Sequence, residues 1–241
     1  MKKNFRQFLS LLLLYPATSF SQTAVEPVYE LFDSVIHIQN TDLANGIEYV
    51  EQHIIRSDDH KYFQTMEYLN GNVIYDGQPY SNLDLRYNIF DDLLLTRIPT
   101  AGGATLIQLH KENVQVFNID GHSFIALKGT SDEKPQFYEI LLEGNDILLL
   151  KKHRKKIKKH LDQNFTYFEF KEDTPEYFVS INGNPEEIDS QRSVRKLFPN
   201  KEEQIQNFYR SNSSLKRENP DKFLTLLFQS LILSTSELNL N

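Results

Sequence analysis

The chain has 241 residues, a formal net charge of −7 and no cysteine. The absence of cysteine excludes disulfides and thiolate metal sites as sources of stability. The acidic balance argues against non-specific binding to nucleic acid, which needs a basic surface.

The N-terminus has the pattern of a secretory signal peptide. Three basic residues within the first six positions precede an apolar run over residues 8–15, and small residues at 19 and 21 follow. The run is much shorter than the roughly 20 apolar residues of a membrane-spanning helix. Cleavage near Ser21 removes three positive charges, so residues 22–241 carry −10 in place of −7. We expect an exported protein, periplasmic or extracellular, with neither a transmembrane segment nor a lipid-anchoring cysteine.

After residues 28–38, which mix helical and strand signals, the chain reads as short strands separated by turns. The predicted strands cover residues 47–55, 61–69, 73–75, a stretch from about 80 to 89, 93–97, 106–109, 114–119, 123–127, 137–143, 146–152, 165–170 and 177–182. The turn signals are Asp76-Gly77, Asp91-Asp92, the glycine-containing loop 100–104, Asp120-Gly121, Gly144-Asn145 and Asn182-Gly183. Their spacing is typical of an antiparallel sandwich or barrel.

The clearest local pattern lies between residues 70 and 97. Leu83, Leu85, Tyr87 and Ile89 alternate with polar residues, which include Arg86. Because successive strand residues point to opposite faces, this pattern predicts a half-buried antiparallel strand.

The period changes after residue 186. Residues 192–197 predict a helical turn, and Asn200 is the expected N-cap of a helix over 201–210. Pro220 is expected at the first position of a further helix. In that helix a docking stripe is formed by Phe223, Leu226, Leu227 and Leu231. We therefore predict a mainly β antiparallel meander over 22–190, forming a sandwich or partly open barrel, with a C-terminal helical hairpin over 191–241 packed on it.

Several segments resemble a group of exported β-rich proteins of Gram-negative bacteria, familiar from the Bacteroidetes, to which no activity is assigned. The resemblance covers most of the mature chain and is carried by residues 71–78, 85–92, 137–139, 148–152, 177–179 and 195–198. It implies export and a β-rich fold, and it transfers no catalytic residue to this chain.

No motif in the sequence assembles a recognisable active site. The acidic pairs Asp58-Asp59 and Asp91-Asp92 lie at predicted turns, where Asp is favoured for backbone hydrogen bonding, so we interpret them as solvated turns. Neither pair supplies the several closely spaced oxygen ligands of a calcium loop. The seven histidines show no metal-site spacing.

Ser123 follows His122, but adjacent strand residues face opposite ways, so we interpret Ser123 as the start of a strand. We therefore expect no catalytic residue, metal or cofactor.

A basic run lies within this acidic chain. Its cations are Lys151, Lys152, Arg154, Lys155, Lys156, Lys158 and Lys159. The run is either a solvated strand end and loop, which is the commoner use of such blocks, or a contact for anionic lipid headgroups or an acidic partner.

Aromatic residues gather in the first half of the mature chain. They are Tyr62, Phe63, Tyr68, Tyr75, Tyr80, Tyr87 and Phe90. Core and cross-strand packing is the first explanation, and a concave sheet that holds an apolar ligand is the second. The function we expect is a non-catalytic interaction or ligand-binding module for an apolar ligand or an envelope component. The alternative is an envelope hydrolase whose site combines residues that lie far apart in the sequence.

We predict that the mature protein begins at Gln22 and purifies from the soluble periplasmic or extracellular fraction without detergent. Intact-mass measurement of the exported protein checks the cleavage position. Retention of the first 21 residues in a membrane fraction would contradict export with cleavage.

Overall fold

The computed structural model describes residues 38, 41–56, 58–129, 134–144 and 146–236. The signal-peptide segment and most of residues 28–38 lie outside this part of the chain. The strands are β1 (Ile47–Glu48), β2 (Leu69–Tyr75), β3 (Gln78–Asn88), β4 (Leu93–Thr100), β5 (Gly103–Gln108), β6 (Val114–Ile119), β7 (His122–Leu127), β8 (Gln136–Gly144), β9 (Ile147–Lys152), β10 (Lys155–Leu161), β11 (Thr166–Glu172), β12 (Glu176–Ile181) and β13 (Asn184–Glu187). The 3-10 helices are η2 (Asp42–Asn45), η3 (Lys111–Asn113) and η4 (Pro199–Lys201), and the α-helices are α2 (Gln191–Leu197), α3 (Glu202–Ser211), α4 (Ser213–Glu218) and α5 (Pro220–Ser236).

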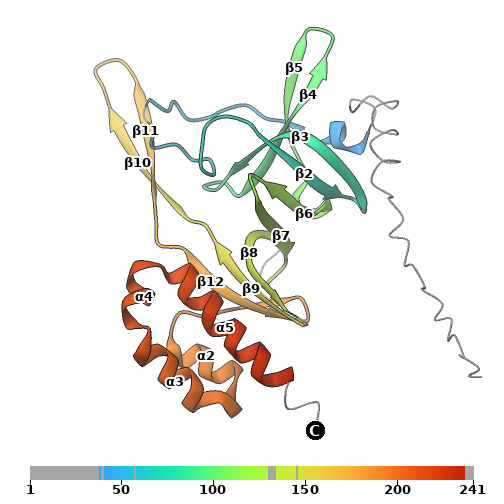
Figure 1. Cartoon of the computed structure of the whole chain (residues 1–241). Helices are drawn as coiled ribbons and strands as arrows, with labels where there is room; N and C mark the ends of the chain where they lie inside the picture. Colours follow the sequence, from blue (N-terminus) through green and yellow to red (C-terminus); the bar gives the residue numbers. More distant parts are fainter. Residues whose placement is uncertain (1–37, 39–40, 57, 130–133, 145, 237–241) are drawn as a thin grey trace, which may run out of the picture.

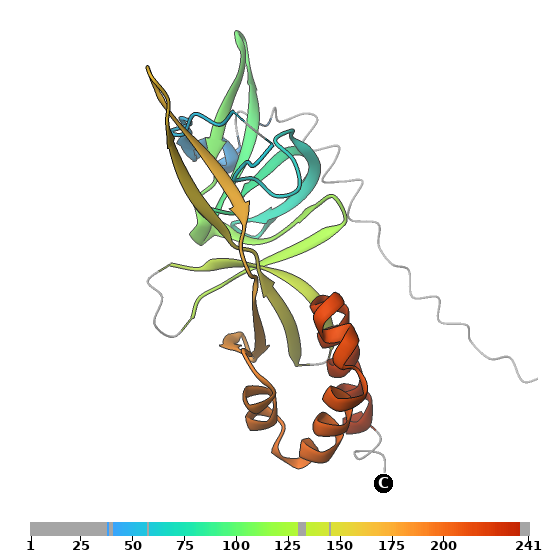
Figure 2. The same cartoon turned by 90° about the vertical axis from the view of Figure 1, so that its left-hand side faces the viewer.

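Eleven of these strands form one antiparallel sheet in the order β1-β5-β4-β3-β2-β6-β7-β8-β9-β12-β13, while β10 and β11 form a separate ribbon. The edge strands do not pair with each other, so the sheet is not closed into a barrel. The predicted mainly β antiparallel fold is confirmed. The α-helices gather at one end of the molecule and the β4–β5 hairpin projects from the other (Figures 1 and 2).

Three tight turns follow directly from the sequence. Both residues of Asp76-Gly77, Asp120-Gly121 and Asn182-Gly183 have positive φ. A two-residue hairpin loop of this kind matches the right-handed twist of its strands, and glycine adopts it without steric cost. The predicted loop over 100–104 is also a tight connection, because β4 continues to Thr100 and β5 begins at Gly103.

The alternation predicted for β3 is confirmed, since Leu83, Leu85, Tyr87 and Ile89 are all buried. Asn88 belongs to the opposite, polar face, yet it is fully buried. Its Nδ2 donates to Asp91 Oδ2 at 2.7 Å, and its Oδ1 accepts from the Asp91 backbone N–H at 3.0 Å. The side chain of Asn88 therefore stabilises the bend between β3 and β4. The alternation of apolar and polar residues in β3 does not predict this role.

The first core lies inside the half of the sheet that runs from β5 to β8. The ring of Phe117 stacks on Phe124 at 4.7 Å, and Tyr87 and Phe137 meet these rings edge-on. Most of the aromatic residues that crowd the first half of the chain are buried, among them Tyr62, Phe63, Tyr75, Tyr80 and Tyr87. The side chains of the sheet thus fill its interior, as the packing interpretation predicts.

The second core lies between β9, β12 and the C-terminal helices. Phe223, Leu227 and Leu231 are buried as predicted, but Leu226 is partly exposed. Leu224 and Phe228 complete the apolar face instead, because residues four apart share one side of the helix. The sheet contributes Leu149 and Val179 to this core, so the helices pack directly on it.

The helical region contains more elements than the predicted hairpin. Pro220 begins α5 as predicted, but α4 is an additional helix. Asn200 is part of η4 and does not cap α3, which begins at Glu202 without a side-chain cap.

The strands predicted over 47–55 and 61–69 are wrong. Only Ile47–Glu48 pairs as β1, and β2 starts at Leu69. The intervening chain makes single hydrogen bonds to several elements, such as the Phe63 N–H to the Tyr87 carbonyl at 2.8 Å. Tertiary contacts determine the backbone conformation of this segment. Lys61 is 1% exposed, and its Nζ lies 2.7 Å from Glu51 Oε1. A regular strand would not bring these side chains together.

We predict that Gly71→Ala destabilises the protein by about 1–3 kcal/mol, as overpacking of a dense core does. A Cβ at this position would lie 2.3 Å from the Asn118 carbonyl oxygen and 2.7 Å from Leu85 Cδ1. Urea unfolding measures the change. The control is Gly102→Ala, because a Cβ there meets no atom within 4 Å. Equal stability of the two variants would contradict the prediction.

Candidate functional site

The acidic bend at Asp91-Asp92 is a turn with an exposed Asp91, as predicted, but both carboxylates also form internal ion pairs. Asp91 Oδ2 lies 3.3 Å from the buried Lys61 Nζ. Asp92 Oδ2 lies 2.7 Å from Lys111 Nζ, and Asp92 Oδ1 accepts a hydrogen bond from the Tyr87 hydroxyl at 2.8 Å. The bend therefore holds ion pairs with Lys61 and Lys111, and Asp92 also lies 3.8 Å from Lys152 Nζ. The other acidic pair fits the prediction better, since Asp58 is exposed and Asp59 forms a long ion pair with Lys171 at 3.7 Å.

His122 takes part in a partly buried cluster, centred on the buried Glu139, that its sequence position does not reveal. Its Nδ1–H donates to Glu139 at 2.5 Å, and the Nε2–H of His153 donates to the other carboxylate oxygen at 2.6 Å. Ser123 instead donates to Asn118 Oδ1 at 2.6 Å and does not contact His122. Ser123 is thus a strand residue, as predicted. In the described part of the chain, no group of three or more His, Cys, Asp or Glu side chains could hold a metal ion.

The basic run forms two strands and not a loop. Lys151 and Lys152 end β9, and the run continues into β10, which pairs with β11 over its whole length. Lys152 is buried, and Lys155 Nζ donates to the His60 carbonyl at 2.7 Å. The members of the run that can meet an anionic surface are the exposed ones, which are Arg154, Lys156, Lys158 and Lys159.

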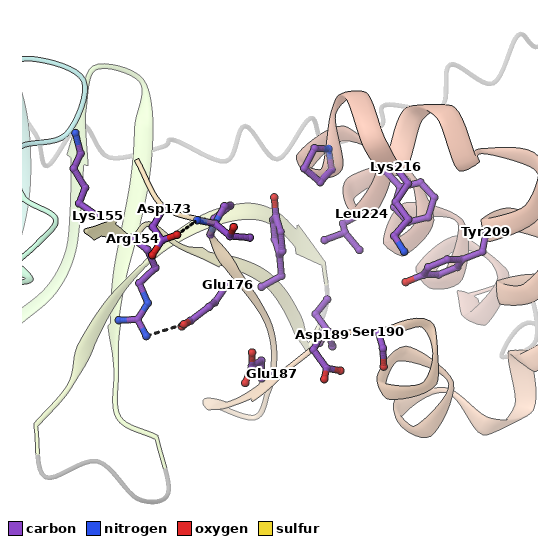
Figure 3. Close-up of a pocket in the computed structure, with 16 residues that line it drawn as sticks. Arg154, Lys155, Asp173, Glu176, Glu187, Asp189, Ser190, Tyr209, Lys216 and Leu224 are labelled. Carbon is purple, nitrogen blue, oxygen red and sulfur yellow. Dashed lines mark hydrogen bonds and ion pairs between the residues drawn. The ribbon is translucent and has the colours of Figure 1, made fainter. Parts of the chain in front are cut away.

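A cavity of about 690 Å³ lies where the end of the sheet meets the C-terminal helices, and we call it the helix pocket (Figure 3). Its walls come from six places in the chain. The lining residues are Arg154, Lys155, Asp173, Thr174, Pro175, Glu176, Tyr177, Glu187, Ile188, Asp189, Ser190, Tyr209, Lys216, Pro220, Phe223 and Leu224.

Aromatic and aliphatic side chains form one wall of the helix pocket. The rings of Tyr209 and Phe223 meet edge-on at 4.9 Å, and Leu224 lies beside them. Burial raises the pKa of Tyr209 to about 12, so its hydroxyl is neutral at physiological pH. The ammonium of Lys216 lies 5.1 Å from the centre of the Tyr209 ring. This wall offers an apolar surface with a cation at its edge.

Charged groups form the opposite side of the helix pocket. Arg154 and Glu176 form an ion pair of 2.7 Å at this rim. Glu187 and Asp189 are exposed, and within the described residues neither forms an ion pair. Figure 3 shows the two carboxylates apart from the Arg154–Glu176 pair. The rim therefore has carboxylates that remain available to a ligand.

Asp221, in the first turn of α5, fixes the helix wall against the sheet. Its carboxylate accepts a hydrogen bond from the Tyr177 hydroxyl at 2.5 Å and lies 2.6 Å from Lys151 Nζ. A carboxylate is favoured at a helix N-terminus by the helix dipole. Burial and the contact with Asp221 raise the pKa of Tyr177, which remains a hydrogen-bond donor. These contacts tie the start of α5 to β9 and β12.

Comparison with known proteins finds no match: no family model, curated protein or solved structure is similar to this chain. The chemistry of the pocket must therefore be inferred from its own geometry.

The sequence predicted only part of the helix pocket. Phe223 belongs to the predicted docking stripe, but Tyr177 and Tyr209 carry no signal of their own. Five helix residues and the link between β11 and β12 meet only because α5 folds back on the sheet.

We predict that Glu139→Gln flattens the dependence of stability on pH as the pH falls through the ordinary carboxyl range and below it. Burial opposes ionisation of Glu139, but hydrogen bonds from His153 and His122 outweigh it and hold the pKa of its carboxyl below 4.5. The unfolded chain thus binds a proton before the native state does as pH falls. The native stability that this carboxylate supplies is present above pH 4.5 and is lost through the lowered pKa.

Urea unfolding over this pH range measures the slope, and at neutral pH the variant should lose about 1–3 kcal/mol. Glu143→Gln is the matched control, because Glu143 is an exposed carboxylate on the same strand. Equal pH slopes for wild type and Glu139→Gln would show that the cluster contributes nothing to acid stability.

Proposed function

We propose that this chain is an exported ligand-binding module of the bacterial envelope and that the helix pocket is its binding site. Export is supported by the signal-peptide pattern with cleavage near Ser21 and by the resemblance to exported β-rich proteins. No helix in the described residues is long and apolar enough to cross a membrane. The observation that carries the proposal is the helix pocket itself, because it combines an apolar wall with a charged rim.

The pocket chemistry suits an amphipathic ligand. An apolar body can pack against the half-buried ring of Tyr209, because this contact removes apolar surface from water, while the buried Phe223 and Leu224 complete the same wall. A polar or positively charged end can pair with Glu187 and Asp189, which have no ion-pair partner among the described residues. The volume of about 690 Å³ accommodates a small molecule or a few residues of a peptide.

The hydroxyl groups in the helix pocket favour binding over hydrolysis. The hydroxyl of Ser190 accepts from the Ser193 backbone N–H at 3.2 Å and so caps α2. The Tyr177 hydroxyl donates to Asp221, but burial and this carboxylate raise its pKa, and burial raises the pKa of Tyr209, so both hydroxyls stay protonated. A nucleophilic hydroxyl needs an adjacent base that accepts its proton. These groups instead hold the pocket walls in place, so the hydrolase alternative has no support at this site.

We predict that Thr174→Trp blocks the helix pocket without unfolding the protein. Thr174 is exposed and lines the pocket between β11 and β12, so an indole there occupies ligand space. Nile red, a neutral apolar dye that fluoresces on leaving water, is the probe. We expect its dissociation constant to rise about tenfold, which is about 1.4 kcal/mol.

The matched control is Gln163→Trp in the turn between β10 and β11. Gln163 is also exposed, and its N–H donates to the preceding Asp162 as that of Thr174 does to Asp173. Both variants should keep the wild-type unfolding midpoint. Unchanged dye binding in Thr174→Trp, or the same loss in both variants, would refute the helix pocket as the binding site.

A further inference from the structure

A second cavity, of about 350 Å³, lies beside the bend between β3 and β4, and we call it the basic pocket. Its polar lining residues are Asp92, Lys111, Lys134, Gln136, Lys152 and Arg154. The lining thus has four cations and one carboxylate, in a protein whose net charge is −7. Arg154 lines this cavity and the helix pocket alike, but the other residues are different.

Two of the four cations have carboxylate partners outside the basic pocket. Arg154 pairs with Glu176 at 2.7 Å, and Lys134 pairs with Glu112 at 3.4 Å. Lys111 and Lys152 remain, and they share Asp92. The carboxylate lies 2.7 Å from Lys111 Nζ but 3.8 Å from Lys152 Nζ. One positive charge is therefore left without a matching negative charge.

Asp92 cannot form a shorter ion pair with Lys152, because its carboxylate oxygens already accept hydrogen bonds from other donors. Oδ1 accepts from the Tyr87 hydroxyl at 2.8 Å. Oδ2 accepts from Lys111 Nζ and, at 3.4 Å, from the Phe137 backbone N–H. A carboxylate held in this way is fixed in position and cannot turn toward a second ammonium.

Among the four cations, Lys152 is the one whose charge an added anion would stabilise most. It is 5% exposed, and in the described chain its ammonium forms no hydrogen bond. Burial and the positive charges of Arg154 and Lys111 lower the pKa of Lys152, and Asp92 offsets this only in part. A buried charge without full pairing is costly, and an anion in the cavity would relieve that cost.

We propose that the basic pocket binds a multivalent oxyanion of the phosphate class, held by Lys111, Lys152 and Arg154. A group with two negative charges and several acceptor oxygens matches cations that converge from different elements: Lys111 in η3, Lys152 at the end of β9 and Arg154 before β10. A single carboxylate has only one charge to offer. The amide of Gln136 adds an uncharged donor at the same cavity.

The test is calorimetric titration of the full mature protein with inorganic phosphate at about 0.15 M ionic strength, where exposed charges are screened. We expect saturable binding by wild type and an affinity loss of about tenfold or more in Lys152→Met, which keeps the length of the side chain but removes its charge. Lys158→Met is the matched control, because it removes the same charge from the exposed face of β10.

Lys111→Met keeps the test decisive if Lys152→Met fails to fold. It frees Asp92 to pair with Lys152, so phosphate affinity should fall by a similar factor while Lys152 remains in place. Vesicles of phosphatidylcholine with and without phosphatidic acid separate the two sources of phosphate. Binding to these vesicles that depends on Lys152, without binding of free phosphate, would assign the site to a lipid headgroup.

Absence of saturable binding to both probes would overturn the proposal. So would an equal loss in Lys158→Met, because the binding would then belong to the exposed basic face of β10. Thr174→Trp should leave phosphate binding unchanged, so this inference and the proposed function fail or succeed independently.

Discussion

One constraint shapes the whole structure: a single antiparallel sheet of eleven strands has more apolar surface than its own curvature can cover. The half from β5 to β8 encloses an aromatic core, in which Phe117 and Phe124 stack. The half with β9 and β12 has no such enclosure, and α5 covers it with Phe223, Leu227 and Phe228. The first half therefore buries its apolar side chains against each other, whereas the second half buries them under helices.

The boundary between the two cores is where buried charges gather. Glu139 on β8 holds His122 and His153, while Asp92 holds Lys111 and meets Lys152 at a longer distance. At such a boundary, strands turn from one core toward the other, and polar groups can be buried only if they are paired. The same region opens into the basic pocket, and the helix pocket lies beyond it where the helices meet the sheet. Both candidate sites thus lie near the place where the sheet stops enclosing its own core and the C-terminal helices begin to cover it.

Much of the fold could be predicted because its signals are local. A turn such as Asn182-Gly183 needs only two residues with positive φ, and the alternation of β3 needs only one buried face. The segment from 49 to 68 was mispredicted because its aromatic residues suggest strands, while its backbone follows contacts with distant elements. The charge of the basic run indicates solvent and so favours a strand end and loop over a surface contact, but residues 155–161 pair with β11 as a strand.

The sequence alone determined the mainly β class, three of the hairpin turns, the buried face of β3 and the start of α5. These features depend on side-chain period and on backbone preferences within a few residues. Only the tertiary structure decided that Lys152 and Asp92, separated by 60 positions in the sequence, share one cavity. It alone brought Tyr177, Tyr209 and Phe223 to one pocket. Sites of this kind require the sheet and helices to pack first, because packing sets the distances between side chains that are far apart along the chain.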